Sequence, residues 1–241
     1  MMRIGILETG RPAPSLAAEY GSYPDMVATL LAAGDGQLEF ARYAVLEDEL
    51  PAEVDDCDGY VVTGSRFAVM EETPWMLRLE SFLRHAMAAE RPIFGICFGH
   101  QILAKAMGGV VKKAGQGWQL GLKRYHLVKR PDWMDPAPDS IVLNAFHQDQ
   151  VQEIPDGAEI IATAIACPVA GLAYGDKAFS LQAHPEFSVE FERALLQANS
   201  GKTVPTDLGR EALSDLTAGT ETDAPLVARW VRRFFLGQPP A

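Results

Sequence analysis

The stretch Arg91–Gly109, RPIFGICFGHQILAKAMGG, carries the pattern that decides the fold. A short apolar run over Pro92–Ile96 is typical of a buried strand, and the apolar residues that follow recur at helical spacing. Cys97 therefore lies where a strand turns into a helix. Gly95 and Gly99 flank it on either side and permit a sharp turn with close backbone approach, as in the elbow of hydrolases.

The predicted position of Cys97 suits a nucleophile. A strand-to-helix turn exposes its side chain at the carboxyl edge of the sheet, and the positive end of the helix favours thiolate over thiol. The amide of Phe98 would then be free to bind an oxyanion. A small buried cysteine in a tight packing site is the alternative, since unpaired cysteines are among the most buried residues.

A second motif, QAHPEF, lies much later in the chain and favours the nucleophile. Alternating apolar and polar residues up to His184 predict a strand with one face buried and one presented to a site. Pro185 pushes His184 toward an extended conformation, so its imidazole and the Glu186 carboxylate can project to the same side and hydrogen-bond. Cys97, His184 and Glu186 then supply a nucleophile, a base and an orienting acid.

Together, the two motifs resemble the class I, or triad, glutamine amidotransferase family. Gly95–Gln101 resembles that family's G-x-C-x-G-x-Q elbow, and His184-Pro185-Glu186 resembles its H-P-E pair, in the expected order and at the expected separation. The similarity extends from Arg3 to about Asn199. The resemblance implies that Cys97, His184 and Glu186 form the catalytic triad.

A third stretch, Thr63-Gly64-Ser65-Arg66, stands where the family has a small-residue turn that supplies a second amide to the oxyanion hole. It departs from the G-G-P form of GMP synthase-type members, which suggests a stand-alone GMP-synthase-like subgroup. Either Gly64 or Ser65 could therefore join Phe98 in the oxyanion hole. An ordinary strand-to-loop turn is the alternative.

The resemblance also implies substrate contacts. Gln101 matches the glutamine of the family's elbow, and Phe146–Val151 resembles a loop whose histidine and aspartate, here His147 and Asp149, lie near the amino-acid end of glutamine. A helix-surface glutamine and a polar hairpin loop are the alternatives that need no function. Neither a metal nor an organic cofactor is required by this chemistry.

The alternation of strand and helix predicts a doubly wound α/β fold. The resemblance implies a flavodoxin-like, mostly parallel sheet flanked by helices, with a small antiparallel sheet and C-terminal helices. We expect strands at Arg3–Leu7, Leu38–Leu46 and Gly59–Thr63, a loop at Arg11–Tyr20, and helices at Ser22–Ala33, stopped by Gly34, and at Pro74–Ala89. Later short strands, several of them antiparallel, should cover one end of the sheet, at Val110–Lys112, Gly121–Val128, Ser140–Ala145 and Ile160–Ala164.

Residues 1–200 are expected to form the amidotransferase domain and residues 201–241 a helical extension packed on it. The extension should hold helices at Asp207–Ala218 and Asp223–Leu236, joined by the linker Thr217–Thr222. The second helix has an apolar face, with Arg229, Arg232 and Arg233 on the other side. Packing on the parent domain is our interpretation; a docking face for a synthetase that receives ammonia is the alternative.

Composition narrows the class of protein. The 241 residues are 48% hydrophobic, enough for a substantial core, and the formal net charge of −11 argues against nucleic acid or an anionic membrane as partner. We find neither a signal peptide nor an apolar run long enough to cross a bilayer. Three cysteines without C-x-x-C spacing suggest free thiols and a cytoplasmic protein rather than a disulfide framework or a zinc site.

The function expected from the resemblance is a glutamine amidotransferase-like hydrolase that cleaves the γ-carboxamide of glutamine through a cysteine thioester and releases ammonia and glutamate. A γ-glutamyl peptide hydrolase would use the same triad, and the loops Ser65–Glu72 and Gly115–Leu122 do not decide between the two. A non-catalytic glutamine-sensing or partner-binding module is a third hypothesis. The presence of all three triad residue types argues against it.

Overall fold

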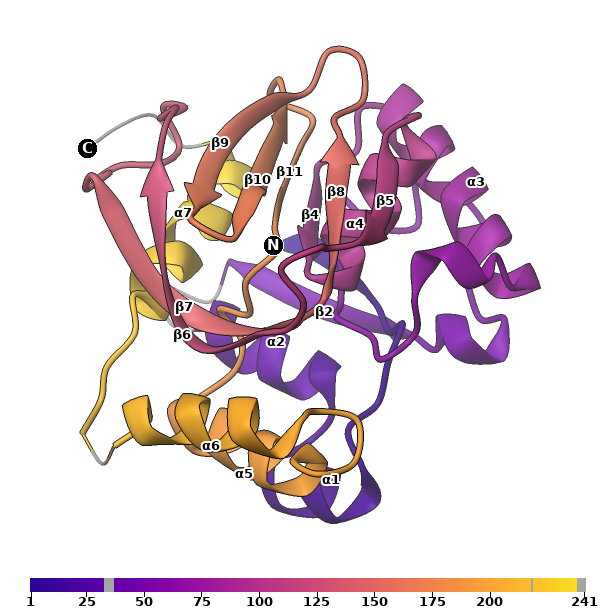
Figure 1. Cartoon of the computed structure of the whole chain (residues 1–241). Coiled ribbons are helices and arrows are strands. Elements are labelled where there is room, and N and C mark those ends of the chain that lie inside the picture. The colour runs from indigo at the N-terminus through magenta and orange to yellow at the C-terminus, as the bar shows by residue number, and fades with distance from the viewer. Residues whose placement is uncertain (33–36, 218, 238–241) are drawn as a thin grey trace.

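The fold is built on one nine-stranded sheet, seen in a computed structural model that describes residues 1–32, 37–217 and 219–237 (Figure 1). Five neighbouring strands are parallel, in the order β2 (Leu38–Tyr43), β1 (Met2–Leu7), β3 (Gly59–Val62), β4 (Ile93–Ile96) and β11 (Ala178–Leu181). The sheet continues antiparallel through β10 (Cys167–Tyr174), β9 (Glu159–Ala164), β6 (Gln119–Leu127) and β7 (Ser140–His147). A small antiparallel sheet pairs β5 (Val110–Lys113) with β8 (Asp149–Glu153).

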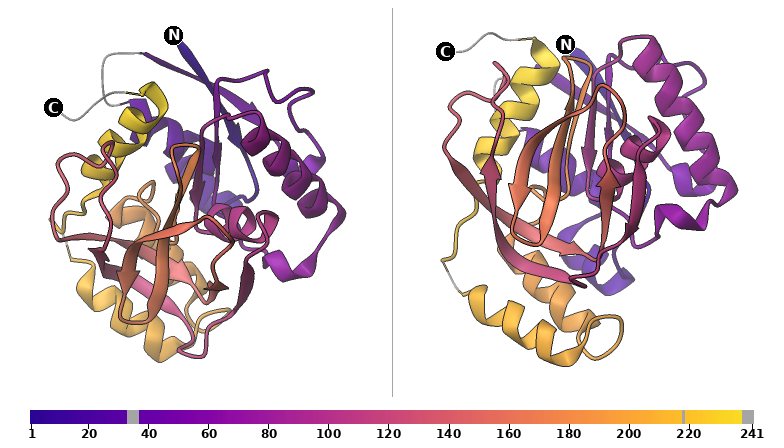
Figure 2. Two further views of the ribbon diagram at one scale, coloured as in Figure 1. Left: turned by 90° about the horizontal axis from the view of Figure 1, so that it is seen from above. Right: turned by 45° about the horizontal axis from the view of Figure 1, so that its top comes forward.

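Every residue of β3, β4 and β11 is buried, which explains why these strands are short apolar runs without alternation. Helices cover both faces of the sheet, with α2 (Tyr23–Ala32) and α7 (Ala224–Leu236) on one face and α3 (Pro74–Ala88) and α4 (Phe98–Ala106) on the other (Figures 1 and 2). The predicted α/β fold, with a mostly parallel central sheet, a small antiparallel sheet and C-terminal helices, is confirmed.

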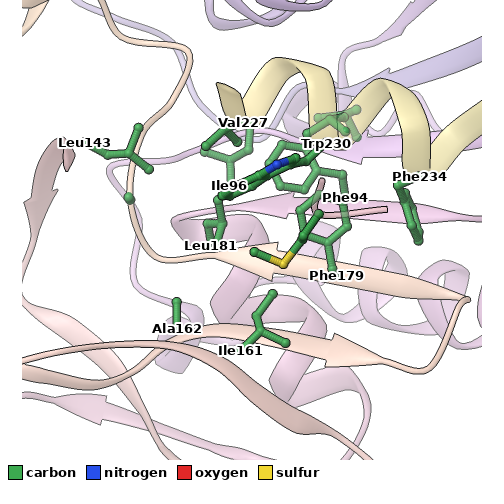
Figure 3. Packing of buried hydrophobic residues seen from close by; sticks show 14 of the residues in the cluster. Phe94, Ile96, Leu143, Ile161, Ala162, Phe179, Leu181, Val227, Trp230 and Phe234 are labelled. Carbon is green, nitrogen blue, oxygen red and sulfur yellow. The ribbon is translucent and has the colours of Figure 1, made fainter. Parts of the chain in front are cut away.

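Helix α7 packs its apolar side onto the centre of the sheet. In Figure 3, Val227, Trp230 and Phe234 from this helix lie over Phe94 and Phe179 from the strands below. The ring centroids of Phe179 and Phe234 are 4.9 Å apart, and those of Phe94 and Phe179 are 4.5 Å apart. The apolar face of α7 is thus covered within the chain.

Two of the three arginines on the polar side of α7 are covered as well. Arg232 and Arg233 are both nearly buried, because the end of α2 contacts Arg232 and the segment around Asp135 contacts Arg233. Arg232 donates a hydrogen bond to the Leu31 carbonyl at 2.8 Å, at the end of α2. The guanidinium of Arg233 lies 3.2 Å from the Asp135 carboxylate, so each buried charge has polar partners.

Three further helices gather at one end of the molecule: α1 (Pro14–Tyr20), α5 (Val189–Asn199) and α6 (Thr206–Asp215) (Figure 1). Leu16 of α1 packs with Tyr23 and with Phe191 and Leu195 of α5. Parallel strands β1, β3 and β4 end near these helices, so side chains at the strand ends meet this cluster.

Several expected boundaries differ from the structure. The loop at residues 11–20 is wrong, because Pro14 begins a helix whose Leu16 is buried. The loop at residues 146–151 is also wrong: its residues belong to β7 and β8, separated by Gln148 alone. Strands β6, β7 and β9 extend the main sheet, because β10 continues the ladder beyond β11.

Strand β10 and helix α5 were not expected from the sequence. Residues 33 and 34, where the helix expected from Ser22 should end, and residue 218 of the expected linker lie outside the described residues. None of the helices described is long and apolar enough to cross a membrane. Cys57, Cys97 and Cys167 are all buried free thiols.

Candidate active site

Cys97 occupies a strained turn between β4 and α4. Its φ of 50° and ψ of −97° place a non-glycine residue in a region that L-residues rarely adopt. A Cβ on Gly95 would lie 2.7 Å from the Gly99 carbonyl oxygen, and one on Gly99 would lie 2.4 Å from the Val62 carbonyl oxygen. Both glycines are therefore required by close backbone packing, which holds the turn in place.

The neighbouring strand brings the second motif to Cys97. The amide of Cys97 donates a hydrogen bond to the Leu181 carbonyl at 2.8 Å, because β11 lies beside β4. Beyond Leu181 the chain leaves the sheet, and the amide of His184 donates to the Asn144 carbonyl of β7 at 2.9 Å. The strand expected to reach His184 ends three residues earlier for this reason.

The imidazole of His184 is held on three sides. Its Nδ1 lies 2.8 Å from Oε1 of Glu186, and its ring stacks on Phe187 with centroids 4.0 Å apart and an interplanar angle of 7°. Gly64 lies against its Cε1, because a Cβ built there would come within 2.8 Å of that atom and within 3.9 Å of the Cys97 Cβ. The sulfur, imidazole and carboxylate expected to act together are thus brought together.

The charges around His184 favour its protonated form. Burial alone would lower the pKa of the imidazole, but the Cys97 thiolate and the Glu186 carboxylate, through their charges and hydrogen bonds, raise it well above its usual value. An imidazolium is the form that can deliver a proton to a departing group.

Thr9 holds the turn expected to complete the oxyanion hole. Its hydroxyl donates to the Thr63 carbonyl at 2.8 Å and lies 3.2 Å from the Gly64 carbonyl oxygen. Because C=O and N–H point in opposite directions across a trans peptide, the amides of Gly64 and Ser65 are directed away from Thr9. Within the described part of the chain neither amide has a backbone acceptor, and the Phe98 amide is the first of α4.

Gln101 and Gln182 form a buried amide network beside the sulfur. The side-chain nitrogen of Gln101 donates to the Asp149 carbonyl at 2.8 Å and to Oε1 of Gln182 at 3.2 Å. Gln182 in turn donates to Sγ of Cys97 at 3.5 Å. Gln101 is therefore a buried residue that links Asp149 to the Cys97 environment, not a residue of the helix surface.

The two histidines nearest to this network are buried and neutral. Burial and the charge of His184 lower the pKa of His147 to about 3. Burial lowers the pKa of His100 to about 4, and its Nδ1 lies 2.8 Å from the Ser180 hydroxyl. His100 is thus tied to β11, away from the role of a base for Cys97. The Asp149 carboxyl is half-buried, and its burial raises its pKa.

Sequence reasoning missed four residues near this site: Thr9, Gln182, Phe187 and Glu192. The QAHPEF motif contained Gln182 and Phe187, and their proximity to His184 along the chain was the available signal. Thr9 lies just after the first strand and gave no sign of its partner 54 residues later. Glu192 lies fully buried on α5, where burial raises the pKa of its carboxyl to about 8.

A pocket of about 610 Å³ opens onto His184. Its walls come from the turn after β1, the turn after β3, and helices α1, α3 and α5. Cys97 is only 5% exposed and is not among the lining residues. The pocket therefore reaches the imidazole, while the sulfur lies outside its lining.

Comparison with known proteins agrees with this geometry. The family model described as "Glutamine amidotransferase class-I" matches residues 20–201, about three quarters of the chain. The chain belongs to the class-I glutamine amidotransferase family. The elbow, the HPE segment and the FHQD segment of this amidotransferase all lie within the matched residues.

Curated relatives of this amidotransferase carry more than one activity in their names. Gamma-glutamyl peptidase 4 of Arabidopsis thaliana is 31% identical over 70% of this chain and 69% of its own length. A glutamine amidotransferase-like protein of Schizosaccharomyces pombe is 28% identical over 86% of this chain and 88% of its own length. A glutamine amidotransferase structure from Thermotoga maritima superposes with a TM-score of 0.72 at 18% identity, covering 97% of this chain and 98% of its own, and so supports the fold.

Proposed function

We propose that this amidotransferase hydrolyses the γ-carboxamide of glutamine, with Cys97 as nucleophile, His184 as acid and base, and Glu186 as the group that orients the imidazole. One observation carries the proposal: the buried Nδ1 to Oε1 hydrogen bond of 2.8 Å orients a ring that lies, with the strained Cys97, against Gly64. Such an arrangement serves nucleophilic acyl transfer.

The first half of the reaction forms a thioester. The Cys97 sulfur attacks the γ-carbonyl carbon, and the charge that develops on the oxygen is stabilised by the Phe98 amide and an amide from Gly64 or Ser65. As the carbon–nitrogen bond breaks, the imidazolium of His184 gives its proton to the nitrogen, and ammonia leaves.

The second half regenerates the enzyme. The now neutral His184 takes a proton from water, the resulting hydroxide attacks the thioester carbon, and the carbon–sulfur bond breaks to give glutamate and the Cys97 thiolate. Glu186 fixes the tautomer of the ring during this half and stabilises the imidazolium that forms again. Gln101, His147 and Asp149 are proposed to shape the amino-acid end of the site. Gln101 and the Asp149 carbonyl join the amide network beside the sulfur, and His147 is the buried last residue of β7, two residues before Asp149.

Hydrolysis of γ-glutamyl peptides is a second candidate, favoured by the pocket beside His184. A volume of about 610 Å³ far exceeds what departing ammonia needs. Relatives named gamma-glutamyl peptidases, at 30 to 31% identity, support the same interpretation. Non-catalytic sensing is disfavoured, since a binding module would not need a strained cysteine facing an oriented imidazole.

Ammonia released by this chain could be used by a synthetase. The name of one relative, from Methanococcus vannielii, describes part of a glutamine-hydrolysing GMP synthase, which supports a synthetase partner. We propose such a partner for this chain.

Purified protein incubated with glutamine tests the proposal. We expect release of ammonia and glutamate in equal amounts, and loss of at least about a thousandfold in rate for Cys97→Ala and Cys97→Ser. Cys167→Ala provides the matched control, because Cys167 is also a buried free thiol. A Cys97 variant that is folded by circular dichroism and keeps a tenth of the rate would refute the proposal.

A further inference from the structure

The pocket beside His184 lies on the side where a leaving group must depart. Under the proposed function, on which this inference rests, His184 gives its proton to the nitrogen of the leaving group. That nitrogen must therefore lie on the imidazole side of the sulfur. His184 lines the pocket and Cys97 does not, so any group attached to the nitrogen would extend into the pocket.

Two arginines line this pocket and differ in their partners. The guanidinium of Arg11 is neutralised, because it lies 3.1 Å from the Glu8 carboxylate and 2.6 Å from the Glu47 carboxylate. Arg66 has no carboxylate within ion-pairing distance in the described parts of the chain, and its guanidinium carbon lies 5.2 Å from the centroid of the Phe67 ring. It is an exposed cation held over an aromatic ring at the edge of the pocket.

Aromatic side chains form much of the remaining wall. Phe67, Trp75 and Phe146 are partly exposed and line the pocket. The rings of Phe67 and Trp75 meet edge to face with centroids 5.9 Å apart, and Trp75 lies 5.7 Å from the ring of Phe98, next to Cys97. The exposed parts of Phe67 and Trp75 therefore form an aromatic wall beside Arg66, and the buried ring of Phe98 supports this wall from behind.

We propose that this pocket is a leaving-group subsite for γ-glutamyl dipeptides whose second residue is aromatic, with the ring of that residue against Phe67 and Trp75 and its carboxylate on Arg66. A guanidinium binds a carboxylate through paired charged hydrogen bonds, and an aromatic wall accepts a ring by edge or offset stacking. In a chain of net charge −11, an unpaired arginine beside the active site also attracts an anionic substrate locally.

The reaction at this subsite balances as it does for glutamine. The Cys97 sulfur bonds to the γ-carbonyl carbon, the amide carbon–nitrogen bond breaks, and the nitrogen of the departing amino acid takes the proton of His184. Water then cleaves the thioester to give glutamate. The free aromatic amino acid leaves through the pocket.

Kinetics with three substrates test the subsite: γ-glutamylphenylalanine, γ-glutamylphenethylamide, which lacks the carboxylate, and γ-glutamylglycine, which lacks the ring. We expect kcat/KM for γ-glutamylphenylalanine to exceed that for each of the other two substrates at least about tenfold. Each of those substrates lacks either the charged hydrogen bond to Arg66 or the ring in the pocket, and either interaction accounts for a factor of this size. In Arg66→Gln, the kcat/KM values of γ-glutamylphenylalanine and γ-glutamylphenethylamide should lie within about twofold of each other. Arg11→Gln is the matched control, and its ratio of these two values should stay close to that of the unchanged protein.

Three results would overturn the subsite. One is a kcat/KM for γ-glutamylphenylalanine that equals the kcat/KM for γ-glutamylphenethylamide in the unchanged protein. Another is hydrolysis of glutamine without hydrolysis of the dipeptides. The third is an equal loss for both phenyl substrates in Arg66→Gln, which would place Arg66 at the carboxylate of the γ-glutamyl group. Each of these leaves the proposed function standing.

Binding separates the subsite from catalysis. In Cys97→Ala, which cannot turn over under the proposed function, calorimetry should give γ-glutamylphenylalanine a Kd at least about tenfold below that of γ-glutamylphenethylamide. The added change Arg66→Gln should remove the difference. Equal Kd values in Cys97→Ala would refute the subsite, whereas γ-glutamyl hydrolysis that survives Cys97→Ala would refute the proposed function.

Discussion

Gly64→Ala should slow the enzyme by moving His184. A Cβ at this position would lie 2.8 Å from Cε1 of the imidazole, whereas ordinary contacts of a Cβ begin at 3.4 Å, so the ring or the loop must retreat by about 0.6 Å. The ring cannot turn freely, because Phe187 stacks on its face and Glu186 holds its Nδ1.

The expected loss follows from the sensitivity of catalysis to position. A misplacement of about 1 Å in a reacting group costs roughly a hundredfold in rate, so a shift of about 0.6 Å should cost about tenfold to a hundredfold in kcat. In transition-state free energy, this is about 1.4 to 2.7 kcal/mol. The backbone of Gly64 does not require positive φ, so the effect comes from the added methyl group alone.

Ammonia release from glutamine at saturating concentration measures this prediction. Gly115→Ala is the matched control, because a Cβ there would meet no atom within 4 Å, and it should keep the rate of the unchanged protein. Thermal unfolding followed by circular dichroism checks that both variants are folded. A Gly64→Ala protein that works within twofold of the unchanged rate would show that the position of the His184 ring does not limit catalysis.

Three other predictions test separate parts of the structure. Glu186→Gln should lower kcat by roughly a thousandfold to ten-thousandfold. Because loss of the Glu186 charge also lowers the pKa of His184, the alkaline limb of the pH–rate profile should move to lower pH. An alkaline limb that stays in place would contradict this role of Glu186. Glu192 binds a proton when folded up to pH about 8, while its unfolded form releases it near pH 4.5, so the free energy of unfolding should fall as pH rises between these values. Urea denaturation at pH 5 and 8.5 should show a smaller fall for Glu192→Gln, and equal falls would count against the buried acid. Trp230→Ala should lower the free energy of unfolding by about 3 to 5 kcal/mol in urea, because Trp230 is 1% exposed where α7 packs on the sheet. Leu208→Ala, at a residue 40% exposed, is the control, and equal losses would contradict the packing of α7.

The part of the fold that could be predicted from sequence is the part where local pattern and tertiary structure agree. Strand β4, the elbow at Cys97 and helix α4 followed from an apolar run, two glycines and a helical repeat. Helix α1 was missed because two prolines looked like loop signals, although Pro14 stands at the first turn, where its missing amide costs nothing.

Long-range pairing could not be predicted. The segment after Leu181 bends because Asn144, far away in sequence, accepts a hydrogen bond from the His184 amide. Strands β9 and β10 join the main sheet through a ladder whose register no local pattern specifies. Arg232 and Arg233 lie on the charged side of an amphipathic helix, and only the fold reveals that this side is covered as well.

The candidate site shows the same division. The motifs predicted which side chains converge, and the structure brings Cys97, His184 and Glu186 to one place. Thr9 and the arginine pair of the pocket were out of reach, because their roles depend on what each one touches. Arg11 and Arg66 look equivalent in sequence, yet one is paired with two carboxylates and the other lies against an aromatic ring.

Mass spectrometry of the protein, quenched with acid during turnover of excess glutamine, tests the central claim most directly. The account predicts a γ-glutamyl group on the peptide that contains Cys97, and unmodified Cys57 and Cys167. Turnover with the group on another residue, or with Cys97 unmodified under conditions in which thioester hydrolysis limits the rate, would contradict it.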